Sequence, residues 1–345
     1  MIDHKRRLIQ AKRDNNLKSI VEVLLSLRVN ALQISPELRK NLVYELIRND
    51  VFLVASATKN QFLLELLDAT KVSPALCHAL LSLISVIVST LKGVEYIVMN
   101  GHQIVTKIIE ILKDQQDGSV NQRFCIAILQ KVSIKEDTVP VFLKKVSSPL
   151  CPGGEDMIEW ALALVDRATR KPDIHIFSLD FASALLANIL HAPSTQDHLS
   201  KQKSQVKWLI NTILKMLREK IPTSVLMHMM ICLSYLKRER FAHAGEECGF
   251  VERISEFVEY YSKVPAAVGP DGSTENGEID KRTVLDLCAH MFHPRDNNNG
   301  TGDEASNLSA GLEYNDMRAD DKIREFENEQ GDLIFECFQD EETMF

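Results

Sequence analysis

The chain has 345 residues, of which 45% are hydrophobic and 26% are charged, and its formal net charge is −8. This composition supplies enough apolar side chains for a long core, and the scarcity of Gly, Pro and aromatic residues suits helical repeats. No apolar run continues without polar residues for the roughly 20 positions that a membrane-spanning helix needs, so no membrane span is expected. The acidic total charge argues against nucleic acid as a partner.

The cysteines occur singly and form no CxxC pair, which indicates reduced thiols and an intracellular, cytoplasmic protein. They are Cys77, Cys125, Cys151, Cys232, Cys248, Cys288 and Cys337. The first residues, MIDHKRRLIQAKRD, lack the apolar core of a signal peptide, so secretion is not expected. Residues 1–16 are interpreted as a basic lead-in whose Lys and Arg side chains could touch phosphates or an acidic protein surface.

After the basic lead-in, the sequence predicts amphipathic and apolar helices that occur in pairs. Residues 19–32 and 36–49 form the first pair, and residues 60–69 and 74–91 form the second. The run at 74–91 comes nearest to a membrane span, but its His, its Ser residues and a flanking Lys favour a buried helix.

The clearest copy of a repeating unit lies within residues 94–133, where a short helix, a medium amphipathic helix and a long apolar helix follow one another. Further copies with the same order lie at residues 138–190 and 195–238, and another begins at residues 238–263. A period of about 45 residues with three helices is the signature of armadillo or HEAT arrays. None of these helices can bury its apolar face alone, so each is expected to pack between neighbouring repeats.

The predicted fold is therefore all-α: an armadillo/HEAT-like right-handed α-solenoid of about six repeats over residues 17–293. A Pro- and Gly-rich loop insert is expected near 264–278, before a possible last helix at 279–292. The segment VSSPLCPGG is interpreted as an insertion between the short and medium helices of one repeat.

Residues 294–345 are predicted to be an acidic, largely disordered tail. From Thr301 onward there are 14 acidic and 3 basic residues, so the rest of the chain is mildly basic. The tail also contains apolar residues among its acids, and a docking motif that occupies the array therefore stays open. These residues are Ile323, Phe326, Leu333, Ile334, Phe335 and Phe338.

No sequence motif for catalysis is recognised: GxSxG, HExxH, a phosphate-binding glycine loop and the kinase motifs are all missing. The segment TENGEID resembles the centre of a calcium-binding loop around Gly277, but the first and last ligand positions are not acidic. Cys288, His290 and His293 are a weak zinc signal, and Met227 to Met230 with His228 are interpreted as helix core. No enzyme activity, metal or cofactor is expected; a metal-dependent enzyme using Cys288 to His293 is a remote alternative.

In armadillo arrays a polar residue near the end of each third helix can hold the backbone of a bound peptide. Alignment of the long helices places Lys131, Asn188 and Tyr235 at that position, and only Asn188 keeps the asparagine. We expect these residues to form a partner-binding groove, so a triple alanine variant should lose its partner and keep its melting temperature. The alternative is that they only cap or solvate their helices.

Several segments together resemble the armadillo domain of the ciliary family of LisH-domain armadillo proteins, the armadillo repeat-containing protein nine family. The resemblance covers most of residues 17–263 and depends on segment order, particularly AILQKVS, the helix around Trp160 and SLDFASALLAN. The family's LisH dimerisation domain and coiled coil are not in this sequence, so the oligomeric state stays open.

The resemblance implies a protein-interaction scaffold of the basal body, centriole and cilium, within the cytoskeleton, that supports cilium assembly or stability. It also implies protein partners such as microtubule regulators of the TOG-array type. The alternative function is a nuclear-import or nucleic-acid adaptor of the armadillo type.

Overall fold

The computed structural model describes residues 2–55, 61–99, 102–147, 151–168, 176–217, 221–236, 241–265 and 275–292. The described residues are mostly helical, and their one β feature is an isolated bridge between Val146 and Glu155. The prediction of an all-α chain is therefore confirmed for these ranges. The acidic tail lies outside them.

The helices in chain order are α1 (Ile2–Arg13), α2 (Leu17–Leu32), α3 (Pro36–Arg48), α4 (Gln61–Ala69), α5 (Pro74–Ile87), α6 (Leu91–Val98), α7 (Gln103–Asp114), α8 (Val120–Val132), the 3₁₀ turn η2 (Glu136–Thr138), α9 (Val139–Phe142), α10 (Met157–Ala168), α11 (Ile176–His191), α12 (Pro193–Ser200), α13 (Lys203–Met216), α14 (Thr223–Leu236), α15 (Ala242–Glu247), α16 (Phe250–Lys263) and α17 (Glu275–Phe292).

Side-chain caps fix where several of these helices begin. Ser73 accepts a hydrogen bond from the backbone N–H of Leu76, and Pro74 occupies the first helical position, where its missing N–H costs nothing. Ser119 caps α8 in the same way, through the N–H of Gln122. These caps explain why the predicted helix starts agree closely with the observed ones.

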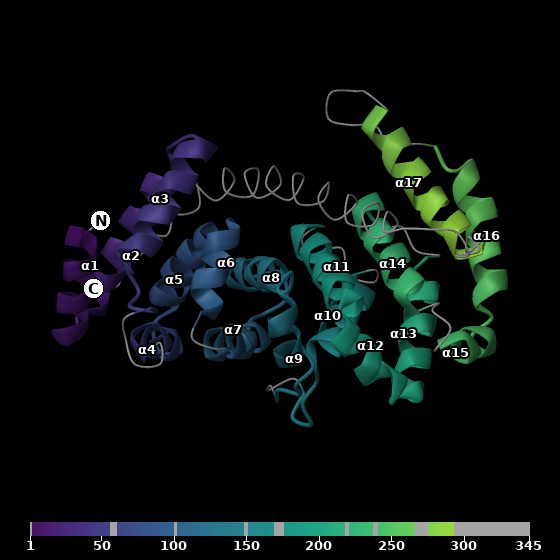
Figure 1. Ribbon diagram of the computed structural model, residues 1–345, viewed down its shortest axis with the longest axis horizontal. Coiled ribbons are helices and arrows are strands. Elements are labelled where there is room, and N and C mark those ends of the chain that lie inside the picture. Colours follow the sequence, from purple (N-terminus) through teal and green to yellow (C-terminus); the bar gives the residue numbers. More distant parts are fainter. Residues whose placement is uncertain are drawn as a thin grey trace, which may run out of the picture. The chain divides into compact units, whose positions relative to one another are not determined.

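The long apolar helices pack in one continuous row, in which α2, α5, α8, α11, α14 and α17 each contact the next (Figure 1). We call this row the inner row. A second row contains the helix that precedes each member in the chain, and these pairs are α1·α2, α4·α5, α7·α8, α10·α11, α13·α14 and α16·α17. The remaining helices are α3, α6, α9, α12 and α15, among which α3 packs on α6 and α9 packs on α12, and we call them the third row.

The inner row contains the core. From Phe124 to Val132 every residue of α8 is buried, and α11 and α14 are buried on nearly all sides. Helices without a polar face must be covered all round, and neighbouring members of the row supply much of that cover. The prediction that these helices lie between their neighbours is confirmed.

The structure differs from the predicted boundaries at both ends of the array. Residues 2–13 of the lead-in form α1, which buries Leu8 and Ala11 against α2 because these two residues share one helix face. Lys5 donates a hydrogen bond to the carbonyl of Asn49, so part of the basic charge is used within the fold. At the other end α17 begins at Glu275, so helix replaces the last residues of the predicted loop insert.

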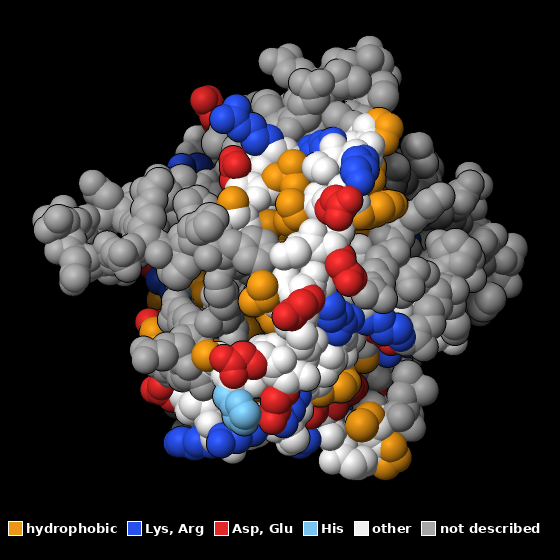
Figure 2. Space-filling view, turned by 90° about the vertical axis from the view of Figure 1, so that its right-hand side faces the viewer, with side chains coloured by type: hydrophobic (Ala, Val, Ile, Leu, Met, Phe, Trp, Pro, Cys, Tyr) orange, Lys and Arg blue, Asp and Glu red, His pale blue; other side chains and the backbone are white. Residues whose placement is uncertain are grey.

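Figure 2 shows the face that includes α16, on which apolar side chains lie next to acidic and basic ones. Val251 and Tyr260 are exposed on α16, as are Glu252, Glu256 and Glu259. Within the described residues no single helix is long and apolar enough to cross a membrane; α11 and α12 reach that composition only as a pair bent by 79°.

Candidate interaction surfaces

The three predicted groove residues lie near the carboxyl ends of successive inner-row helices. Lys131 is on α8, Asn188 on α11 and Tyr235 on α14. The side-chain amide of Asn188 donates hydrogen bonds to the carbonyl of Gln130 at 3.2 Å and to the hydroxyl of Ser133 at 3.0 Å. The ring of His191 lies 5.2 Å from the ring of Tyr235. The three positions therefore lie on three adjacent inner-row helices, and their role in binding a partner stays a prediction.

Their burial gives Asn188 and Tyr235 structural roles. Lys131 is 5% exposed and Tyr235 is 3% exposed, while Asn188 is half-buried. The carbonyls in the last turn of a helix have no partner within the helix, and Asn188 satisfies one of them on α8. Asn188 thus caps the neighbouring helix, which is the alternative that the sequence left open. Truncation of a buried tyrosine typically removes several kcal/mol, so the expectation that the triple alanine variant keeps its melting temperature is abandoned.

A serine, a histidine and an aspartate meet between α11 and α14. The Ser183 hydroxyl lies 2.8 Å from Nδ1 of His228 and donates to the carbonyl of Asp180, while the same Nδ1 lies 3.9 Å from Asp180 Oδ1. In a catalytic triad the two ring nitrogens contact the serine and the carboxylate separately, whereas here one nitrogen faces both. All three residues are buried. This arrangement ties two core helices together and does not position a nucleophile.

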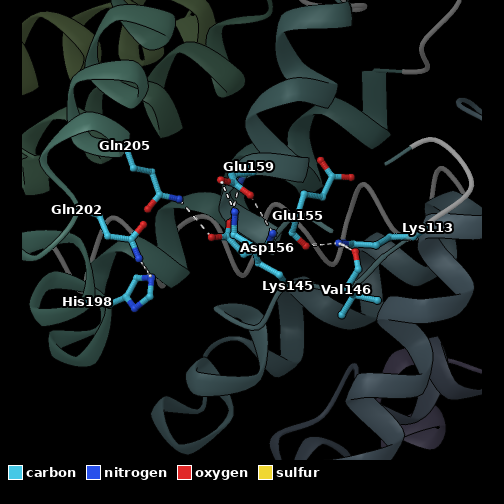
Figure 3. A network of polar contacts seen from close by, with 9 residues as sticks. All are labelled: Lys113, Lys145, Val146, Glu155, Asp156, Glu159, His198, Gln202 and Gln205. Atoms are coloured by element: carbon cyan, nitrogen blue, oxygen red, sulfur yellow. Dashed lines mark hydrogen bonds and ion pairs between the residues drawn. The ribbon is translucent and has the colours of Figure 1, made fainter. Parts of the chain in front are cut away.

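The insertion between α9 and α10 is held by a buried lysine from α7 (Figure 3). Val146 and Glu155 pair through backbone hydrogen bonds of 3.0 and 3.3 Å, which brings the two ends of the insertion together. The Lys113 ammonium donates to the carbonyl of Val146 at 3.0 Å and also to that of Glu155. Burial lowers the pKa of Lys113. We call this arrangement the lysine clamp.

The start of α10 continues the same network (Figure 3). The Asp156 carboxylate accepts from the N–H of Glu159 at 2.9 Å, and the Glu159 carboxylate accepts from the N–H of Asp156 at 3.1 Å. This reciprocal pair is a capping box. Gln205 of α13 donates to the second oxygen of Asp156 at 3.2 Å, and Lys145 lies 3.4 Å from Glu159. Burial raises the pKa of Asp156 and of Glu155.

The lysine clamp is therefore a brace that fixes the position of a surface loop. The Lys113 ammonium is engaged with backbone carbonyls, and the carboxylates of Asp156 and Glu159 are engaged with backbone N–H groups, Gln205 and Lys145. Beyond the bridge, Ser147, Pro152 and Gly153 are exposed and Cys151 is half-buried. The loop is thus presented on a rigid base, as binding loops commonly are. The sequence predicted the insertion but not Lys113, whose partners lie 33 and 42 residues further along the chain.

The weak metal signals are not supported by the described residues. Glu275 to Asp280 belong to helix α17, so Gly277 does not sit at the turn of a calcium loop. Cys288 is buried with its sulfur 3.4 Å from that of Met230, and burial raises its pKa to about 12. His293 and the side chain of His290 lie outside the described residues. Among the described residues no group of three His, Cys, Asp or Glu side chains is placed to hold a metal ion.

The helices of the described residues and their packing define the class of protein: an all-α array of stacked helices, consistent with an α-solenoid. Comparison with family models, with curated proteins and with solved structures finds no match.

Proposed function

We propose that this chain is a protein-interaction scaffold built as an armadillo-like α-solenoid. The observation that carries the proposal is the three-row packing, in which each inner helix contacts the next. Stacked repeats of this kind provide extended surfaces that bind other macromolecules. The right-handed superhelix of armadillo repeats belongs to the same proposal.

The rows favour a grouping into six units. Each inner helix groups with the second-row helix before it, and every pair except the first is preceded by a third-row helix. The units would then be α1–α2, α3–α5, α6–α8, α9–α11, α12–α14 and α15–α17. This grouping keeps the predicted count but shifts the boundaries at the start of the array, since α3 goes with α4 rather than with α2.

The proposed cellular place is the basal body, centriole and cilium, with microtubule regulators of the TOG-array type as partners. The sequence resemblance described above supports this proposal. The chain would support cilium assembly or stability through binding and without catalysis.

Proximity labelling in ciliated cells tests the proposal. The tagged chain should label centriolar, basal-body and microtubule-regulating proteins above a tag-only control. A profile dominated by import factors or nucleic-acid-binding proteins would replace it with the adaptor function. A labelling profile equal to that of the tag-only control would contradict the proposed scaffold function.

A further inference from the structure

Helix α1 has an exposed face at one end of the array (Figure 1). Another side of the helix packs on α2, where Leu8 and Ala11 are buried. On the exposed face Ile2 is 59% exposed, and Arg6 and Arg13 are also exposed. These side chains are therefore accessible to a partner.

Six residues form this face, and we call it the α1 basic face: Ile2, Lys5, Arg6, Ile9, Lys12 and Arg13. They share one side of the helix because neighbouring members are three, four or seven positions apart. Residues seven apart lie nearly above one another, so the two isoleucines form a middle row with the lysines on one side and the arginines on the other. Asp3 shares the next row with Gln10, beyond the arginines, so no acidic residue of α1 interrupts the face.

The α1 basic face has an excess of positive charge. Lys12 pairs with Glu65 of α4 at 3.1 Å, and Lys5 donates to the carbonyl of Asn49 at 2.8 Å. Neither arginine has an ion pair within the described residues. Four basic side chains and the one acidic partner leave an excess of three positive charges, although the whole chain has a net charge of −8.

We propose that the α1 basic face binds the surface of an anionic lipid bilayer. The isoleucines enter the headgroup region, while the lysines and arginines contact lipid phosphates and carboxylates on either side. Clusters of about four to eight Lys and Arg side chains on an amphipathic helix are typical of binding to anionic lipids. The proposal goes beyond the scaffold function and concerns attachment at the membrane surface, not a membrane span.

The composition of the face favours a bilayer over a nucleic acid or an acidic protein. Surfaces that bind single-stranded nucleic acid combine cations with aromatic side chains on which bases stack, and this face has no aromatic residue. Between proteins, binding energy concentrates in aromatic and Arg anchors that fill pockets, whereas both isoleucines here stand between two rows of cations. A helix that lies flat on a bilayer uses this order, since apolar side chains enter the bilayer while long cationic ones reach the phosphates beside them.

Co-sedimentation of the full-length protein with lipid vesicles at about 0.15 M salt tests the proposal. The protein should bind phosphatidylcholine vesicles that contain about 30% phosphatidylserine about tenfold more tightly than vesicles of pure phosphatidylcholine. Arg6→Glu/Arg13→Glu should weaken that binding about tenfold or more, because each cation near an anionic membrane strengthens binding about fivefold. Ile2→Ser should weaken it severalfold, because serine has little apolar surface to bury.

The matched control is Arg7→Glu/Arg282→Glu, which reverses two exposed arginines outside the face and changes the net charge equally. Arg7 belongs to the same helix but lies beyond the row of Asp3 and Gln10, so this variant should keep most of the affinity. All four changed arginines are exposed, so both double variants should keep the melting temperature of the unmodified protein within a few degrees, measured by circular dichroism.

Absent binding, or equal binding to the two kinds of vesicle, would overturn the proposal, as would equal loss of binding in both double variants. Full competition by soluble glycerophosphoserine would overturn it in favour of a site for a free phosphate group. Binding of a labelled polyglutamate peptide through Arg6 and Arg13, without binding to vesicles, would replace the bilayer with an acidic protein. The scaffold function does not depend on these outcomes, because proximity labelling tests it separately.

Discussion

At the scale of single residues, Asn188 shows how a side chain predicted to bind a partner can serve the fold. It joins α11 to the end of α8 through two hydrogen bonds. The Gln130 carbonyl also accepts from the Ser133 hydroxyl, so loss of the Asn188 amide removes two hydrogen bonds between helices without leaving that carbonyl unpaired. Each such bond contributes about 0.5–1.5 kcal/mol to stability.

Asn188→Ala should therefore lower the free energy of unfolding by about 1–3 kcal/mol in urea titrations. Asn188→Asp should be at least as damaging, because a carboxylate cannot donate to the Gln130 carbonyl. Asn30→Ala is the control, since Asn30 is an exposed asparagine of the inner-row helix α2, and it should change stability by less than about 0.5 kcal/mol. A harmless Asn188→Asp substitution would argue that the amide is not a cap.

His78 makes stability depend on pH. Burial, followed by the charge of Arg28, lowers the pKa of His78 to about 4, although a hydrogen bond with Asn121 opposes the shift. Its ring packs edge-on against Phe124 at 5.5 Å. Between about pH 6.5 and pH 4 the unfolded chain binds this proton and the folded chain does not, so this contribution to stability is lost as pH falls.

The slope due to His78 should approach about 1.4 kcal/mol per pH unit within that window. His78→Gln should flatten the difference in stability between pH 6.5 and pH 4.5, measured by chemical unfolding. Other groups titrate in the same range, so the comparison is between the two proteins at each pH. Parallel pH profiles would show that His78 protonates normally in the fold.

At the scale of elements, the approach of α6 to α5 depends on a residue without a side chain. A β-carbon on Gly93 would lie 1.7 Å from the carbonyl oxygen of Ile87. Backbone cannot yield as a flexible side chain does, so Gly93→Ala should cost several kcal/mol by forcing the helices apart.

Gly153 supplies the matched control, because a β-carbon there meets no atom within 4 Å. Gly93→Ala should lower the melting temperature by roughly ten degrees or more, whereas Gly153→Ala should leave it nearly unchanged. Equal melting temperatures in calorimetry would mean that α6 can move at little cost.

The lysine clamp gives a second prediction for an element. Lys113→Met keeps the length of the side chain but removes the donor to two carbonyls, and should cost about 1–3 kcal/mol. Hydrogen exchange at the amides of Val146 and Glu155 should accelerate, because their bridge loses its support. Lys144→Met removes an exposed lysine from the same segment and should alter neither quantity.

At the scale of the whole molecule, we expect the effect of a core substitution on neighbouring helices to depend on where its helix lies in the inner row. Val225 on α14 and Val284 on α17 are both fully buried. However, α14 packs between α11 and α17, whereas α17 contacts α14 and α16 and no later helix of the described ranges. In arrays with only nearest-neighbour contacts, an end unit opens alone more easily than a central one.

Val284→Ala should therefore increase exchange mainly in α17 and α16, while Val225→Ala should increase it in α11, α14 and α17 together. Native-state hydrogen exchange with fragment analysis measures both. Uniform loss of protection across the chain in both variants would indicate a single cooperative unit.

Structural features formed by neighbouring residues could be predicted from the sequence, whereas contacts between residues far apart in the chain could not. Helix starts such as Ser73–Pro74 and buried helices such as α8 follow from local patterns, and these predictions agree with the structure. The role of α1 was missed because Leu8 and Ala11 alone make a weak apolar face. The Tyr96 hydroxyl donates to Asp50 at 2.8 Å, although the two residues are 46 positions apart. No local sequence pattern predicts a contact over that separation.

The lysine clamp also has a consequence for how this molecule could diversify. Since Lys113 and the Val146–Glu155 bridge hold the base of the loop, the number of residues beyond that base is not fixed by the helices. Doubling the length of such a loop costs only about 0.6 kcal/mol in closure entropy. Pro152 and Gly153 therefore mark a place where descendants of this gene, or a protein engineer, could add a new recognition element without rebuilding the array.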